Sequence, residues 1–132
     1  MYAQPRALAS AFRRGDESST FDLEGLRVTP TVCFDLRFPR LYWDAAERSD
    51  VFVVIASWPA RRSDHWLTLL KARAVENQCY AVGVNRTGTA PTLAYSGNSA
   101  AFDPLGKVVV DAGSSEGVAV ATVDLDRELV AR

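Results

Sequence analysis

The sequence predicts a layered α/β fold. Two continuous apolar runs of strand length, residues 51–56 and 79–84, are typical of interior strands that are covered on both faces. Between them, residues 64–78 repeat apolar side chains at helical spacing. Short strand-like segments then follow up to residue 123. Helices alternating with buried strands, followed by a run of short strands, indicate one α/β domain.

The composition limits the chain to one ordinary globular domain. Its 132 residues are 48% hydrophobic and 23% charged, enough to bury roughly two-thirds of the surface that the unfolded chain exposes. A net charge of −1 gives no reason to expect nucleic acid or an anionic membrane as a partner. Two cysteines make no disulfide framework and favour the reducing cytoplasm. No apolar run has the length of a membrane span or signal peptide.

The first third of the chain predicts a hairpin that leads into a strand. Residues 1–19 offer little to bury, so we expect either a tail or a chain that has lost its beginning. Residues 20–23 and 26–28 alternate in polarity around a Glu-Gly turn, which predicts the hairpin. Pro30 donates no ladder hydrogen bond, so we expect a bulge or a sheet edge there. Residues 40–48 are consistent with a short helix.

The remaining elements follow from periodicity and turn residues. Asp64 can cap the helix at residues 64–78, with Leu67 and Val75 widening its apolar face. Gly88 and Pro91 favour a loop over residues 87–92. The other predicted elements are short strands at residues 99–102, 108–110 and 118–123, and a final helix at residues 125–132.

The stretch around Cys33 is the first candidate for chemistry. An apolar run, residues 28–32, brings the thiol to the end of a strand, and turn-prone Asp35 and helix-compatible sequence follow. Free backbone N–H groups and the positive end of a helix dipole favour a nucleophilic thiolate at such a position. The same N–H groups could hold the oxyanion of a tetrahedral intermediate. The alternative is a buried cysteine that acts as a small hydrophobic residue.

Four motifs together resemble the nitrilase superfamily of carbon–nitrogen hydrolases. They are VCFDLRFP at residues 32–39, ASWP at residues 56–59, ARAVENQ at residues 72–78, and GNS with DPLG at residues 97–106. The resemblance covers residues 15–130. The first two motifs look most similar to the ω-amidase-like branch, whose members hydrolyse amides of small dicarboxylic acid derivatives.

The resemblance implies a mechanism with a glutamate base, a cysteine nucleophile and a lysine that stabilises the intermediate. Cys33 matches the nucleophile, and the backbone N–H of Phe34 matches an oxyanion donor. The lysine would fall just before Met1, and a further glutamate near Leu8, where there is no carboxylate. The resemblance thus implies a truncated domain, the second half of an α/β/β/α sandwich subunit. It also implies a homo-oligomer that needs no cofactor or metal.

Three residues that follow buried strands are candidates for substrate binding. Trp58, Asn85 and Arg86 share an edge with Cys33 if the strands are parallel. Trp58 could line the pocket or pack its own loop. Asn85 and Arg86 could bind a substrate carboxylate, or they could anchor a loop.

Other polar residues are expected to be structural. Asp35 and Arg37 would fix the turn after the nucleophile through capping and a charge-assisted contact. Arg73 and Glu76, three apart on one helix, would form a surface pair worth about 0.2–0.5 kcal/mol. Glu76 could also support the site indirectly, by contacting residues that in turn contact the substrate.

The single histidine and the second cysteine complete the candidates. His65 could form a Cys–His dyad with Cys33, but it also suits the polar start of a helix. Cys79 opens a buried strand and is expected to be core. Two cysteines and one histidine without close spacing do not predict a zinc site.

The sequence therefore predicts a cysteine-dependent hydrolase that cleaves a small carboxamide through a thioester. One alternative is a non-catalytic fragment or degenerate paralogue of the fold, without the glutamate and the lysine. Another is a complete small cysteine hydrolase that uses His65.

Overall fold

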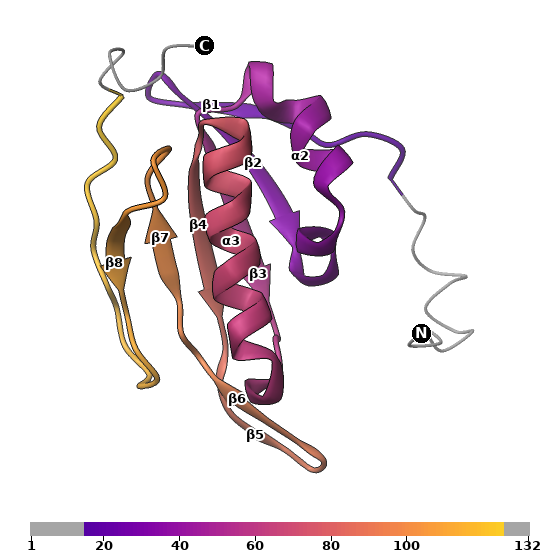
Figure 1. Cartoon of the computed structure of the whole chain (residues 1–132), viewed down its shortest axis with the longest axis vertical. Coiled ribbons are helices and arrows are strands. Elements are labelled where there is room, and N and C mark those ends of the chain that lie inside the picture. Colours follow the sequence, from indigo (N-terminus) through magenta and orange to yellow (C-terminus); the bar gives the residue numbers. More distant parts are fainter. Residues whose placement is uncertain (1–14, 126–132) are drawn as a thin grey trace.

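A computed structural model describes residues 15–125 of the chain. It contains a six-stranded sheet of order β1-β2-β3-β4-β7-β8 and a separate hairpin of β5 and β6 (Figure 1). The strands are β1 (Phe21–Leu23), β2 (Leu26–Val32), β3 (Val51–Ala56), β4 (Tyr80–Asn85), β5 (Thr87–Ala90), β6 (Leu93–Ser96), β7 (Ala100–Phe102) and β8 (Val108–Asp111). The helices are α2 (Pro39–Ala45) and α3 (Ser63–Asn77), with short 3₁₀ helices η1 (Cys33–Arg37), η2 (Ala46–Arg48) and η3 (Ala60–Arg62). The predicted α/β class is confirmed.

The centre of the sheet consists of three parallel strands. β2 pairs with β3 and β3 pairs with β4 in parallel, while β1, β7 and β8 add antiparallel strands at the two edges. β1 pairs with β2 only as far as Val28. Within the described residues Pro30 therefore lies where β2 has one partner strand, so the predicted sheet edge at Pro30 is confirmed.

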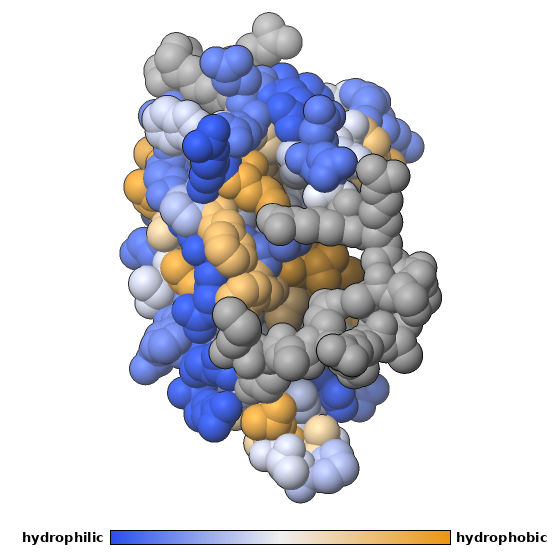
Figure 2. Space-filling model, turned by 90° about the vertical axis from the view of Figure 1, so that its right-hand side faces the viewer, coloured by the Kyte–Doolittle hydropathy of each residue, from blue (hydrophilic) through white to orange (hydrophobic). Residues whose placement is uncertain are grey.

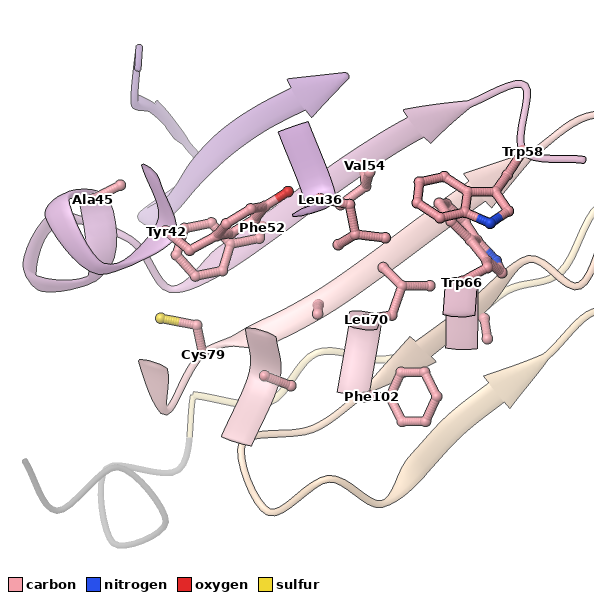
Figure 3. Close-up of a cluster of buried hydrophobic side chains, with 13 residues drawn as sticks. Leu36, Tyr42, Ala45, Phe52, Val54, Trp58, Trp66, Leu70, Cys79 and Phe102 are labelled. Carbon is pink, nitrogen blue, oxygen red and sulfur yellow. The ribbon is translucent and has the colours of Figure 1, made fainter. Parts of the chain in front are cut away.

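One face of the sheet is covered by α2 and α3. Between this face and the helices lies a cluster of buried side chains that includes Leu36, Tyr42, Phe52, Val54 and Leu70 (Figure 3). The glycine at position 83 allows α3 to approach β4 closely, because a Cβ there would lie 2.3 Å from Leu70 Cδ1. Of the residues expected to widen the apolar face of α3, Leu67 packs against the cluster but Val75 is 47% exposed.

The opposite face of the sheet carries apolar residues in register. Its rows are Val28, Val51 and Tyr80, then Pro30, Val53, Val82, Ala101 and Val110, then Val32, Ile55 and Val84. Val32, Ile55 and Val84 are each more than half exposed. The expectation that the interior strands are covered on both faces is therefore wrong at Ile55 and Val84 within the described residues. A side view shows apolar residues at the surface among hydrophilic ones (Figure 2).

Two predicted elements differ from the structure. Residues 87–92, expected to be a loop, contain β5 and the start of the turn into β6. Residues 118–123, expected to be a strand, have no regular structure, and Val118 and Val120 are 93% and 87% exposed. A segment rich in β-branched residues forms a strand only where a partner strand is available. Most of the predicted final helix lies outside the described residues. None of the described helices has the length and hydrophobicity needed to cross a bilayer.

Candidate functional site

The carboxyl ends of the three parallel strands meet at one edge of the sheet. Val32 pairs with Ile55, and Ala56 pairs with Asn85, so β2, β3 and β4 end side by side. Cys33 follows β2 directly, Trp58 lies two residues beyond β3, and Asn85 is the last residue of β4. Ligand sites of open α/β sheets lie at this edge. The predicted candidates therefore share one edge.

Cys33 is the first residue of η1, directly after β2, and its backbone is strained. Its φ is 46°, in the left-handed region that costs a non-glycine residue about 1–3 kcal/mol. The thiol is partly exposed, and no described residue forms a hydrogen bond with its sulfur. Phe34 is the second residue of η1, where backbone N–H groups have no acceptor within a helix. Among the described residues, this turn therefore places a thiol beside an N–H group that has no acceptor within η1.

Asp35 fixes the strand end that precedes the thiol. Its Oδ2 accepts a hydrogen bond of 2.9 Å from the backbone N–H of Val32, and the N–H of Phe38 donates to the carbonyl of Asp35. These two bonds close the turn on both sides of Cys33. The prediction that Asp35 acts through capping agrees with this geometry.

Arg37 connects the turn to the loop after β3. Its guanidinium lies 4.8 Å from the centroid of the Trp58 ring, and its Nη2 lies 3.2 Å from Nδ1 of His65. Arginine can only donate, so Nδ1 of His65 is the acceptor. The histidine nitrogen is therefore directed at a guanidinium, an arrangement that does not support a Cys–His dyad.

Trp58 and Asn85 hold two loops together. The Asn85 side chain accepts from the Trp58 N–H at 2.7 Å and donates to the carbonyls of Trp58 and Gly97 at 3.1 and 2.8 Å. The Trp58 ring is 4% exposed, packs against Trp66 at 5.7 Å, and donates to the Arg62 carbonyl. These contacts favour loop packing for Trp58 and loop anchoring for Asn85 over direct substrate binding.

Arg86 is the exposed member of the three substrate-binding candidates. Its guanidinium stacks 4.4 Å from the centroid of the Tyr95 ring, which belongs to β6. It also lines a hollow of about 400 Å³ whose other walls include Val84, Gly97 and Val118. Cys33 is not part of that hollow. This hollow therefore does not join Arg86 to the thiol.

Arg73 is a functional candidate whose environment the sequence did not reveal. We expected a surface pair with Glu76, and the 2.6 Å contact between Nη1 and Oε1 is present. However, Arg73 is 4% exposed, so the description as a surface pair is wrong. Its Nε and Nη2 both donate to the carbonyl of Leu36, at 3.1 and 2.7 Å. The available signal was its position on the helix stripe that also contains Trp66 and Leu70.

Cys79 is a core residue, as expected. It is 1% exposed, and its S–H group lies 3.2 Å from the Ser49 carbonyl and 3.3 Å from the Asn77 carbonyl. A buried thiol with two carbonyl acceptors has no access to a substrate. Of the two cysteines, only Cys33 is placed for chemistry.

Comparisons with known proteins identify the fold and the family. The carbon–nitrogen hydrolase family profile matches residues 2–131. The chain is 37% identical over 119 residues to the 2-oxoglutaramate amidase of Bacillus subtilis, covering 89% of this chain and 46% of the relative. It is 40% identical over 117 residues to the omega-amidase YafV of Yersinia enterocolitica, covering 87% of this chain and 43% of the relative.

A solved structure gives the same result. A CN-hydrolase superfamily protein of Xanthomonas campestris, XC1258, superimposes with a TM-score of 0.80 at 36% identity, covering 95% of this chain and 51% of that structure. The chain spans about half the length of the curated relatives it matches. The resemblance to the nitrilase superfamily is confirmed, and the chain belongs to the carbon–nitrogen hydrolase family.

Proposed function

We propose that this chain carries the nucleophile of an ω-amidase-like enzyme that hydrolyses a small carboxamide. The observation that carries the proposal is Cys33, held at a φ of 46° between the end of a parallel strand and the start of η1. Two relatives bear the names 2-oxoglutaramate amidase and omega-amidase. These names support 2-oxoglutaramate as the first substrate to test.

The reaction begins with attack of the Cys33 sulfur on the amide carbon. A C–S bond forms, and the electron pair of the carbonyl double bond moves to oxygen, where the Phe34 N–H can donate to it. The oxyanion then collapses, the C–N bond breaks, and the nitrogen takes a proton and leaves as ammonia. Water attacks the remaining thioester, the C–S bond breaks, and the acid and the thiol are released.

Two further groups are required for this chemistry. A base must accept protons from the thiol and the water, and a cation stabilises the oxyanion. The family resemblance implies a glutamate and a lysine that precede the cysteine, and no residue of this sequence matches either one. The alternative to the amidase is a non-catalytic fragment or paralogue that retains the fold.

Arg86 is our proposed contact for the substrate's carboxylate. A guanidinium binds a carboxylate through paired hydrogen bonds, and Arg86 is exposed near the edge that presents Cys33. Tyr95 beneath it limits the orientations of the side chain. Trp58 and Asn85 would then act on substrate binding only through the loops that they hold.

The test begins with the intact mass of the protein from its native source. A mass well above that of the 132-residue chain would point to an additional segment in which to search for the glutamate and lysine. Ammonia release from 2-oxoglutaramate is then measured for the native-length protein and for Cys33→Ala, Arg86→Ala and the control Cys79→Ala. We expect no turnover without Cys33, a KM raised by about tenfold or more without Arg86, and near-normal turnover without Cys79.

Two outcomes would reject the amidase proposal. They are turnover that survives Cys33→Ala, and a folded native-length protein that releases no ammonia from any small carboxamide. The second outcome would favour the non-catalytic function. A KM unchanged by Arg86→Ala would reject only the carboxylate contact.

We also propose that the protein is a cytoplasmic homo-oligomer. The half-exposed row of Val32, Ile55 and Val84 supports association, because apolar surface gains free energy when it leaves water. Two cysteines in 132 residues make no disulfide framework, which supports a reducing compartment. A monodisperse monomer in light scattering would argue against association, and recovery in an extracytoplasmic cell fraction would argue against the location.

A further inference from the structure

Arg73 is a buried cation directly behind the turn that carries Cys33. Its Nε and Nη2 converge on the carbonyl oxygen of Leu36, three residues after the thiol. Leu36 is itself fully buried and belongs to η1. A 3₁₀ helix of five residues is weakly held by its own hydrogen bonds. The external donor therefore fixes a segment that has little stability of its own.

Arg73 is in turn held from three sides. Glu76 binds Nη1 at 2.6 Å, the Tyr42 ring lies 5.2 Å from the guanidinium carbon, and Asn77 donates to the Arg73 carbonyl at 2.9 Å. Tyr42 also bonds through its hydroxyl to Thr31, two residues before Cys33, at 2.8 Å. The guanidinium thus links α3 and α2 to both sides of the thiol turn.

The two ends of the turn are fixed by different groups. Asp35 holds the N–H of Val32 before Cys33, and Arg73 holds the carbonyl of Leu36 after it. Cys33 lies between these two fixed points with its unfavourable φ of 46°. If either point is released, the residue can relax toward the negative φ that L-amino acids prefer.

We propose that Arg73 is the positioning residue that keeps Cys33 in its reactive orientation. Burying a charge carries a desolvation cost, and the partner of Arg73, Glu76, is itself 39% exposed, so stability alone does not account for a buried arginine here. A planar guanidinium can place two donors on one carbonyl while a third donor binds a carboxylate, which lysine cannot reproduce. The inference rests on the proposed function only in taking Cys33 as the nucleophile. Thiol reactivity can be measured without amidase turnover.

The experiment measures the rate at which iodoacetamide alkylates Cys33, with site-resolved mass spectrometry. The variants are Arg73→Lys, Arg73→Met and Glu76→Gln, and the control is Lys71→Met, which removes an exposed cation from the same helix. Cys79, 1% exposed, reports any general loosening of the fold in the same sample.

We expect alkylation of Cys33 to be about tenfold slower in Arg73→Lys, because the relaxed turn no longer holds the thiol in its partly exposed position. Arg73→Met should slow it at least as much. Glu76→Gln, which keeps both bonds to Leu36, should slow it by about threefold, and the control should stay within about twofold of the wild type. Cys79 should stay protected in every folded variant.

Two results would overturn the proposal. One is alkylation of Cys33 in Arg73→Lys within about twofold of the wild-type rate. The other is a parallel rise in the labelling of both cysteines, which would show that Arg73 only stabilises the fold. If an Arg73 variant does not fold, the alkylation rate of Cys33 in Glu76→Gln decides whether the proposal holds, because Glu76 is partly exposed and its replacement should leave the fold intact. Slower alkylation with no effect of Cys33→Ala on turnover would uphold the positioning role and reject the amidase.

Discussion

The two cysteines lie at opposite ends of the three parallel strands, and they differ in exposure, backbone conformation and hydrogen bonding. Cys33 follows the carboxyl end of β2, is partly exposed, and has a positive φ. Cys79 precedes the amino end of β4, is buried, and has its Sγ 3.2 Å from the Ser49 carbonyl and 3.3 Å from the Asn77 carbonyl. In Figure 3, Cys79 and Tyr42 lie toward one end of the core, and Trp58 and Trp66 toward the other. Since both residues are cysteines, their position at the carboxyl or the amino end of the strands decides which thiol can react.

The same contrast applies to the polar groups at each end. At the amino end, the buried Ser49 hydroxyl forms hydrogen bonds with both the Ala45 carbonyl and the Thr29 hydroxyl, so these buried polar groups satisfy one another. At the carboxyl end, the thiol of Cys33 is partly exposed and the side chain of Arg86 is exposed. Satisfied polar groups stabilise a fold, whereas groups left without partners can serve a ligand.

The largest expected effect is a difference in labelling between the two thiols. In the native protein, iodoacetamide should modify Cys33 at least about a hundredfold faster than Cys79, because Cys79 reacts only after local unfolding. Mass spectrometry of timed samples measures both rates at once. Comparable rates in the folded protein would contradict the assignment of the two ends, and equal rates in urea would provide the control.

A smaller effect concerns the contribution of Tyr42 to the stability of the fold and how that contribution depends on pH. Burial, opposed by the hydrogen bond to Thr31, raises the pKa of Tyr42 from its ordinary value of 10 to about 12. The neutral phenol therefore stabilises the folded state below pH 10, and this contribution is lost as the pH rises from 10 through 12. A shift of two units corresponds to about 2–3 kcal/mol at most.

Urea unfolding at several pH values tests this effect against Tyr42→Phe. At pH 8 the variant should be less stable by about 1 kcal/mol, because Thr31 loses its partner. Near pH 12 the difference should shrink or reverse, since the variant has no phenol to ionise at this position. Parallel pH profiles for the two proteins would contradict the assigned pKa direction.

The sequence predicted the elements whose signals are local. Residues 51–56 form β3 as expected, and the helix predicted at residues 64–78 begins and ends within one residue of α3. Pro91 suggested a loop, yet it lies at the turn between β5 and β6, where proline donates no ladder bond. Gly88, with a φ of 97°, is tolerated inside the two-stranded hairpin.

The site was predictable in its position but not in its internal contacts. Cys33 was placed by the motif at residues 32–39, and its shared edge with Trp58 and Asn85 depended only on parallel pairing. The burial of Arg73 depends on the Leu36 carbonyl, 37 residues earlier in the chain, and no local pattern encodes such a contact. The division of roles between Asn85 and Arg86 likewise required the loop geometry.

The smallest predicted effect is the difference in the free energy of unfolding between glycine and alanine variants at each cysteine position. This difference should have opposite signs at positions 33 and 79. At Cys33, glycine should give a protein about 1 kcal/mol more stable than alanine does, because only glycine adopts a φ of 46° without strain. Cys79 is not among the described residues with positive φ, so there glycine should be less stable than alanine by about 0.5–1 kcal/mol. Comparing Gly with Ala at each site removes the thiol from both members of a pair and isolates the backbone. Urea unfolding of the four variants measures both differences, and the same sign at both sites would show that Cys33 is not strained. The expected reversal would mean that backbone strain lowers the stability of the fold at Cys33, the partly exposed thiol, and does not do so at Cys79.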